Sequence, residues 1–308
     1  MDAAETEAAR TRILTNATDA LSEAVDQLAT DSRAARQQYR EGAISTKEYG
    51  NQLAQIDSRA EDLVSTAEAI EERASEDSEL VSRAVELRAQ LMMYTGPVRD
   101  RIATAITEGG SSGQIYIGGG PNGTTSAIIE DGVYVREANR PDQYNSEPGQ
   151  IPQAEPLLEN IRQQYPWVMN QSAGVSFTPL PIDSAGPQYA YWLTLTYPSG
   201  EINAYVDTST QDVYQEVHRI RLDQLEASPD VTIEKTNYVV TVSQSFTGGP
   251  LQVNVTAPDG DPVDAEIRVD NSSVGTTGQD GIYWLIEPAG DYTITAVTDD
   301  TEIRVVNP

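Results

Sequence analysis

The sequence contains one histidine and no cysteine, and these two facts limit the chemistry that it can support. Thiolate zinc sites, multi-histidine metal sites, Cys nucleophiles and disulfides all need residues that are missing. His218 lies in an alternating run that predicts a strand, and no Gly-x-Ser-x-Gly turn supplies a nucleophile for it. We therefore predict no catalytic residue and no bound cofactor, and we interpret His218 as an ordinary strand residue.

Carboxylates are the one reactive group in excess, with 48 Asp and Glu residues against 20 Lys and Arg. A glycosidase needs two carboxylates at a set separation, but at this abundance such pairs also arise by chance. An enzyme of this kind is therefore the third alternative. The glycine-rich run 118–123 lacks the Lys and the helix that follow a phosphate-binding loop, so it predicts a turn.

Calcium is the best metal candidate, because carboxylate oxygens are its preferred ligands. Asp259, Asp261 and Asp264 could supply them at one loop, and Asp270, Asn271 and Asp280 at another. The alternative is that these residues are chosen for the backbone conformations of turns, and we favour it. In molar salt, such loops would also hold Ca²⁺ or monovalent cations weakly.

Five Asn-x-Ser/Thr sequons mark potential glycosylation sites. The candidates are Asn122, Asn170, Asn254 and Asn271. Asn122 and Asn271 fall in predicted turns, where a glycan is tolerated. The fifth, Asn16, lies in the middle of a predicted helix and suits a glycan less well.

Aromatic residues concentrate between residues 165 and 214. Strand alternation places Tyr189 and Tyr191 on one face of a strand and Trp192 on the opposite face. Trp167 and Trp192 are the candidates for a binding face. For Trp167 the alternative is that it packs a helix onto a sheet, and we favour it.

Residues 1–108 carry the spacing of long helices with a heptad seam, which predicts an antiparallel helical bundle or coiled coil. In the first helix the seam comprises Leu14, Thr18, Leu21, Val25, Leu28, Ser32, Ala35 and Tyr39. Breaks are expected at 41–44, at 75–78 and at 95–97, and Ser45 with Glu48 forms a capping box. A self-contained bundle is favoured over an oligomerisation stalk, since two tight turns fold the seams back on each other.

Beyond the Gly/Ser linker 109–113, the composition shifts toward strands and turns. Residues 109–227 predict a small α+β domain with a helix at 155–165 and a hairpin turning at 198–200. Residues 228–308 predict a β-sandwich, because short strands recur every 8–14 residues. Its predicted elements include one long strand at 232–242 and a turn at 271–275.

Residues 188–221 resemble a PepSY-type repeat, a hydrophobic hairpin that ends in a "VDxxTG-x-V" turn. The turn reads Val206-Asp207-Thr208-Ser209-Thr210-Gln211-Asp212-Val213, with Gln211 in place of the usual glycine. This family is associated with extracytoplasmic proteins and, in part, with restraint of secreted peptidases. The resemblance therefore implies a regulator of a secreted peptidase as the second functional alternative.

Residues 248–298 resemble the carboxypeptidase-regulatory or transthyretin-like branch of Ig-like domains. The resemblance rests on the strand 251–256, the turn 259–265 and the segment Pro288–Ile294. The whole arrangement is similar to haloarchaeal surface proteins that have a signal peptide before the helices and a membrane anchor after the sandwich. That resemblance brings no established activity.

The charge pattern agrees with a halophilic source. The net charge is −28 and only Lys47 and Lys235 are lysines. Carboxylates retain water and cations in molar salt, and the salt screens their mutual repulsion. The same charge repels nucleic acid, so none is expected as a partner. We expect a non-enzymatic structural or binding protein on the cell surface, attached only through an anchor outside this sequence, with envelope proteins or its own copies as partners.

Overall fold

The computed structural model describes residues 3–74, 78–108, 114–150, 153–171, 173–180, 188–299 and 301–306. Two compact units are present. The first comprises Met1–Ser111, Ile117–Ala127 and Val135–Arg219, and the second comprises Ser112–Tyr116, Ile128–Tyr134 and Ile220–Pro308. No helix among the described residues has both the length and the apolar character needed to cross a membrane.

The N-terminal region is helical, as predicted. Its elements are α1 (Ala3–Arg40), α2 (Thr46–Arg73), α3 (Ser78–Leu91), the 3-10 turn η1 (Met92–Tyr94) and α4 (Pro97–Glu108). The predicted capping box is confirmed, since the Ser45 hydroxyl accepts the Glu48 N–H while the Glu48 carboxylate accepts the Ser45 N–H. The expected break at 75–78 and the linker 109–113 lie largely or wholly outside the described residues.

The heptad positions of α1 are covered within this single chain. The buried members of the predicted seam are Leu14, Thr18, Leu21, Val25, Leu28, Ser32 and Ala35. Because these side chains are already buried, the structure favours the bundle over the oligomerisation stalk.

The helices are not self-contained, however, because tyrosines connect them to a sheet. The Tyr49 hydroxyl of α2 lies 2.7 Å from Oγ1 of Thr124, and Tyr39 of α1 donates to the carbonyl of Ile117 at 3.1 Å. From the other side, Tyr214 donates to the carbonyl of Ala89 at 3.0 Å. A buried hydroxyl requires a partner, and the partners here come from residues far away in sequence, which the local helical spacing does not reveal.

The sheet has seven strands in the order β1-β2-β3-β7-β6-β5-β4. Their bounds are β1 (Gln114–Gly119), β2 (Thr124–Glu130), β3 (Val133–Asn139), β4 (Gly174–Leu180), β5 (Ala190–Tyr197), β6 (Gly200–Asp207) and β7 (Val213–Arg221). The hairpin of β5 and β6 confirms the predicted turn, with Tyr197 paired to Gly200. The edge strand β4 was not predicted.

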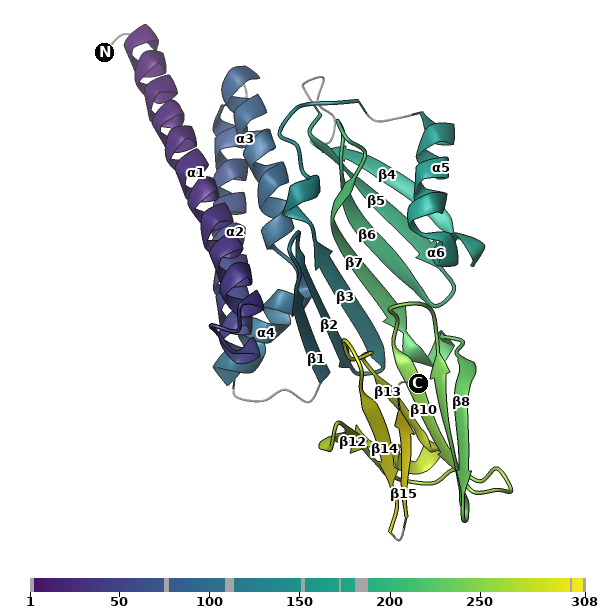
Figure 1. The fold of residues 1–308 in the computed structure, drawn as a ribbon. Coiled ribbons are helices and arrows are strands. Elements are labelled where there is room, and N and C mark those ends of the chain that lie inside the picture. Colours follow the sequence, from purple (N-terminus) through teal and green to yellow (C-terminus); the bar gives the residue numbers. More distant parts are fainter. Residues whose placement is uncertain are drawn as a thin grey trace. The chain divides into compact units, whose positions relative to one another are not determined.

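Helices cover both faces of this sheet (Figure 1). On one face lie α5 (Ala154–Gln164) and α6 (Pro166–Asn170), where Leu157 and Ile161 pack against Leu193 and Leu195. The predicted helix at 155–165 is thereby confirmed. The helices α1–α3 lie on the other face, so the first unit has a helical layer on each side of its sheet.

The second unit contains the predicted Ig-like β-sandwich. One sheet has the order β13-β10-β9-β8 and the other β12-β11-β14-β15. The bounds are β8 (Ser228–Lys235), β9 (Tyr238–Gln244), β10 (Leu251–Thr256), β11 (Glu266–Val269), β12 (Ser272–Thr276), β13 (Ile282–Leu285), β14 (Thr293–Val297) and β15 (Glu302–Val306). Val253 of one sheet and Ile294 of the other are fully buried in the shared core.

Two sequence predictions for the sandwich were wrong. The single strand expected at 232–242 is a hairpin, because Thr236 adopts a left-handed φ of 57° and reverses the chain between β8 and β9. The turn expected at 271–275 is shorter, with left-handed Asp270 and Asn271 followed by the edge strand β12. An edge strand such as β12 buries few side chains, so it can be built from polar residues that are typical of turns. The sequence pattern therefore did not indicate a strand there.

Candidate functional site

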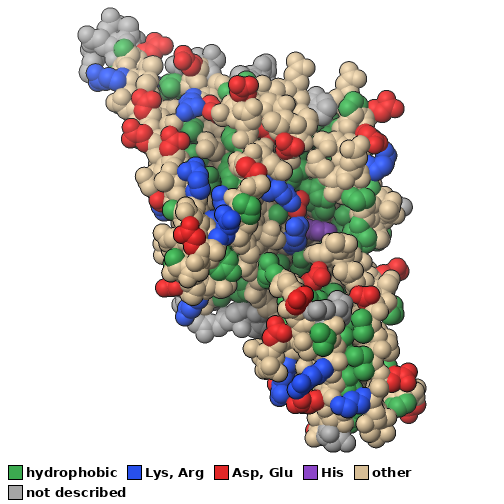
Figure 2. Space-filling view, in the orientation of Figure 1, with side chains coloured by type: hydrophobic (Ala, Val, Ile, Leu, Met, Phe, Trp, Pro, Cys, Tyr) green, Lys and Arg blue, Asp and Glu red, His purple; other side chains and the backbone are tan. Residues whose placement is uncertain are grey.

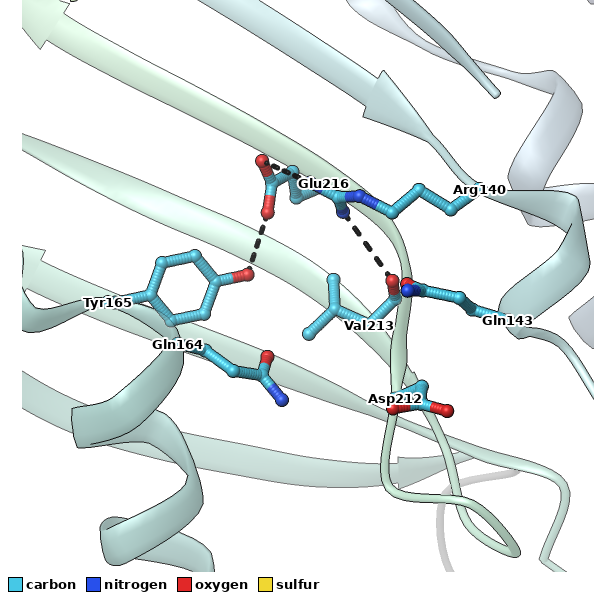
Figure 3. A pocket seen from close by; sticks show the side chains of 7 residues that line it. All are labelled: Arg140, Gln143, Gln164, Tyr165, Asp212, Val213 and Glu216. Atoms are coloured by element: carbon cyan, nitrogen blue, oxygen red, sulfur yellow. Dashed lines mark hydrogen bonds and ion pairs between the residues drawn. The ribbon is translucent and has the colours of Figure 1, made fainter. Parts of the chain in front are cut away.

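A buried carboxylate, Glu216 of β7, is the centre of the densest ionic cluster in the first unit. Its Oε1 lies 2.7 Å from Nη1 of Arg136 on β3 and 3.2 Å from Nη2 of Arg140, which follows β3. Its Oε2 accepts a hydrogen bond from the Tyr165 hydroxyl at 2.8 Å, and Tyr165 ends α5. Figure 3 shows Glu216 between Arg140 and Tyr165. Three separate elements therefore fix one carboxylate.

The surroundings of Glu216 hold it as a permanent anion. Burial alone would raise the pKa of its carboxyl, but the guanidinium groups of Arg140 and Arg136 outweigh that effect and lower the pKa to about 2. In turn, burial and the adjacent carboxylate raise the pKa of the Tyr165 hydroxyl well above its usual value. Neither the Glu216 carboxyl nor the Tyr165 hydroxyl exchanges a proton near neutral pH. The cluster therefore suits binding and positioning rather than acid–base chemistry.

A cavity of about 290 Å³ lies beside this cluster. Its lining residues are Arg140, Gln143, Gln164, Tyr165, Asp212, Val213 and Glu216. Figure 3 shows that they come from the end of α5, from the turn after β3 and from the start of β7. The lining is mostly polar, and its buried charges already have partners, so the cavity suits water or a small polar molecule.

Strand β7 departs from strict alternation at this point. Tyr214 and Gln215 both bond to the helical layer, through the carbonyls of Ala89 and Thr95, whereas Glu216 faces α5. Two successive residues on one face break the period of two that the sequence prediction assumed. For that reason the place of Glu216 at the centre of this cluster could not be deduced from the pattern alone.

His218 is an ordinary buried strand residue, in agreement with its interpretation from the sequence. Its Nε2 is hydrogen-bonded to the Tyr197 hydroxyl, and the ring of Trp167 lies 6.4 Å away. Burial lowers the pKa of the imidazole to about 4, although the nearby Glu216 opposes this effect. The neutral ring therefore contributes packing and its hydrogen bond with Tyr197.

The structure separates the two tryptophans that were the candidates for one binding face. Trp167 packs against the α5-facing core, with its ring 5.5 Å from that of Tyr197 in an edge-on contact. Trp192 lies on the opposite face of β5 and is 41% exposed. The pairing of these two residues was therefore wrong, because Trp167 packs its helix onto the sheet. Trp192 alone stays a surface candidate.

Trp192 belongs to a polar surface that we call the open sheet face. Cross-strand pairs share one face of an antiparallel sheet, and the register pairs Thr178 with Trp192. On the same grounds the face comprises Ser176, Thr178, Trp192, Thr194, Thr196, Glu201, Asn203 and Tyr205. All of these side chains are exposed or half-buried, so the helices on this side of the sheet leave the β4–β6 part accessible.

The loop aspartates of the sandwich support turns. Asp259 accepts the N–H of Asp261 at 3.4 Å, and Asp264 accepts the N–H of Gly278 at 3.0 Å. Within the described part of the chain, no three Asp, Glu or His side chains converge to hold a metal ion. Calcium at Asp259, Asp261 and Asp264 stays an untested prediction.

The sequons differ in accessibility. Asn122, Asn170 and Asn271 are exposed, whereas Asn254 is half-buried in β10. Asn254 is paired on both sides, to Ile282 and to Thr241. A glycan attached there would therefore have to project from a central strand of the sheet.

Comparison with known families finds three matches along the chain. Residues 1–112 match a "Domain of unknown function (DUF7096)" and residues 115–226 match a "Family of unknown function (DUF7094)". Residues 230–305 match the "Archaeal fibronectin-III type-like domain". The match is thus to a fibronectin-type member of the Ig-like sandwiches. No curated protein matches the chain, and no solved structure does.

Proposed function

We propose that this chain is the extracellular part of a cell-surface protein of a halophilic archaeon, and that it binds a component of the cell envelope without catalysing a reaction. The open sheet face carries the proposal. It presents an accessible indole beside hydrogen-bonding side chains on a sheet, and tryptophan is enriched at interfaces because its ring is apolar while its N–H is polar. A membrane anchor outside this sequence would hold the protein at the surface.

The charge distribution supports a halophilic source. The chain carries a net charge of −28, and acidic side chains are spread over the visible face in Figure 2 rather than gathered in one place. Dispersed carboxylates keep a surface hydrated throughout, whereas a single acidic patch would indicate a basic partner. The similarity of residues 230–305 to an archaeal domain agrees with this source.

A second candidate function is regulation of a secreted peptidase through a PepSY-like domain. One observation favours it: Gln211, which replaces the glycine of the PepSY-type turn, has a left-handed φ of 66°. That conformation is the one for which glycine is normally selected. The local backbone therefore fits the turn despite the substitution.

The absence of native cysteine permits a direct test of the surface location. We would introduce a single cysteine at Ala20 or at Asp223, both exposed, and treat intact cells with a membrane-impermeant maleimide. The proposal predicts labelling of both variants in intact cells to the level seen after lysis. Labelling that appears only after lysis would place the chain inside the cell and overturn the proposal.

A further inference from the structure

The open sheet face combines one exposed indole with a row of hydrogen-bonding groups. The indole Nε1 of Trp192 donates to Oδ1 of Asn203 at 3.1 Å. The same Oδ1 accepts the Thr194 hydroxyl at 2.9 Å, and Nδ2 of Asn203 donates to Glu201 at 3.1 Å. Because each side chain restrains the next, the row is fixed before any ligand arrives.

The indole ring lies along the sheet. In the register Trp192 pairs with Tyr205, whereas Asn203 pairs with Thr194, so the indole reaches a diagonal neighbour on the adjacent strand. The ring also lies beside that of Tyr205, with the centroids 5.8 Å apart. Trp192 is still 41% exposed, so part of the indole is accessible to a ligand.

The composition of this face argues against a protein partner. Among the described residues, the exposed large apolar side chains are Ile13, Ile115, Phe177, Trp192 and Val306. Only Trp192 belongs to the open sheet face, since Phe177 is paired with Leu193 and points to the α5 side. The ring of Tyr205 lies beside Trp192 with the centroids 5.8 Å apart, but it is half-buried. The core of a protein interface requires several exposed apolar side chains together, and this face presents one.

The electrostatics argue against an anionic ligand. The carboxylate of Glu201 is 3.6 Å from Nη1 of Arg219, so the charges on this part of the sheet compensate one another. The chain as a whole has a net charge of −28 and repels anions. The face therefore suits a ligand that is uncharged, flat and rich in hydroxyl groups.

We propose that the open sheet face binds a neutral saccharide, with one sugar ring stacked on Trp192. The C–H hydrogens on one side of a hexose ring carry partial positive charge and are attracted by the negative face of an indole. The sugar hydroxyls would bond to Asn203, Thr194 and the exposed hydroxyls of Ser176 and Thr178. This inference rests on the proposed function and names the class of its ligand.

The test is titration of the purified full chain with maltohexaose, cellohexaose and mannohexaose, measured by calorimetry and by tryptophan fluorescence. We expect at least one of the three to bind. Trp192→Ala should weaken that binding about tenfold or more, the loss typical of a removed stacking partner. Phe177→Ala is the matched control, because Phe177 is 42% exposed on the other face, and it should bind as the wild type does.

A second variant keeps the test valid if Trp192→Ala does not fold, which circular dichroism would detect. Thr178→Glu adds a carboxylate directly across from the indole on an exposed position and should also weaken binding. The proposal is overturned if none of the three saccharides binds at millimolar concentration, if both variants bind as the wild type does, or if only the anionic polysaccharide heparin binds. Surface labelling in intact cells would remain unaffected by such a failure, so the two proposals are tested separately.

Discussion

The side-chain Oδ1 of Asp57 accepts the backbone N–H of Gly96 at 2.8 Å, which ties α2 to the turn before α4. On the other side of this turn, Glu137 of β3 accepts the N–H of Val98 at 3.2 Å and pairs with Nε of Arg99 at 3.0 Å. A Cβ on Gly96 would collide with the buried Glu137 carboxylate and displace it from its partners. Two acids and one arginine are thus buried where α2, α4 and the sheet meet.

This arrangement makes stability depend on pH through Asp57. Burial is the largest influence on its carboxyl and raises the pKa from 3.8 to about 7. The folded state then holds the proton more tightly than the unfolded state does. The resulting stability is fully present below pH 3.8 and is lost as pH rises toward 7. Asp57→Asn removes this dependence and keeps an acceptor for Gly96. At pH 8 it should raise the free energy of unfolding by up to about 4 kcal/mol, measured by urea titration.

Asp31→Asn is the control for this experiment. Asp31 is partly exposed on α1, and its hydrogen bond from Arg59 lowers the pKa of its carboxyl. Its substitution should therefore cause a small loss of stability at pH 8 instead of a gain. Equal stability of Asp57→Asn and the wild type at pH 8 would contradict the role given to Asp57.

Removing the charge of Glu216 should destabilise the first unit strongly. Glu216→Gln leaves Arg136 and Arg140 without their shared anion in a largely buried setting, and losses of about 3–5 kcal/mol are typical. Because the pKa of Glu216 is lowered to about 2, its stabilisation is present above pH 4.5 and is lost as pH falls toward 2. The control is Glu201→Gln, at an exposed ion pair, which should change the free energy of unfolding little. An equally small effect of Glu216→Gln would show that the cluster adds no stability.

The sequence predicted the helical region, the hairpin of β5 and β6 and the sandwich, because each depends on local periodicity and turn residues. It did not predict β4, whose exposed residues alternate too weakly to reveal a strand. Nor did it predict that the helices depend on the sheet. Tyr49 and Tyr214 occupy ordinary core positions in the pattern, and only the fold shows where their hydroxyls bond.

The residues of the candidate site could likewise be predicted only where the local pattern was sufficient. Trp192 could be predicted because side chains alternate along a strand, which places it on the face opposite to Tyr191, and this alternation holds along β5. Glu216 was missed because parity fails in β7 and because one acid among 48 carries no distinguishing signal. Asn203 was missed because an isolated amide in a strand gains significance only from its cross-strand neighbours.

Gln211 tests whether side-chain bonds outweigh backbone preference. Its left-handed conformation favours glycine, but its side chain donates to the carbonyl of Thr208 at 2.7 Å and accepts from the Tyr191 hydroxyl at 3.1 Å. Gln211→Gly should therefore lower stability by about 1 kcal/mol in thermal unfolding. Asp131→Gly, at an exposed turn with φ of 51°, should be neutral or slightly stabilising. A gain from Gln211→Gly would contradict this ranking.

Salt should stabilise the chain throughout the molar range. With a net charge of −28, repulsion among carboxylates persists until the Debye length falls to about 3 Å near 1 M. Circular dichroism in KCl from 0.1 to 3 M should show a thermal midpoint that rises most steeply up to about 1 M, while light scattering gives the monomer mass of 33.5 kDa. A midpoint that is independent of salt would remove the argument for a halophilic source.

The central claim is that the chain binds the cell envelope through its open sheet face. The most direct measurement is co-sedimentation of the purified chain with envelopes isolated from a halophilic archaeon that carries this gene, in molar KCl. The account predicts that the wild type and Phe177→Ala sediment with the envelopes and that Trp192→Ala stays in solution. Equal sedimentation of all three chains, or of none, would contradict it.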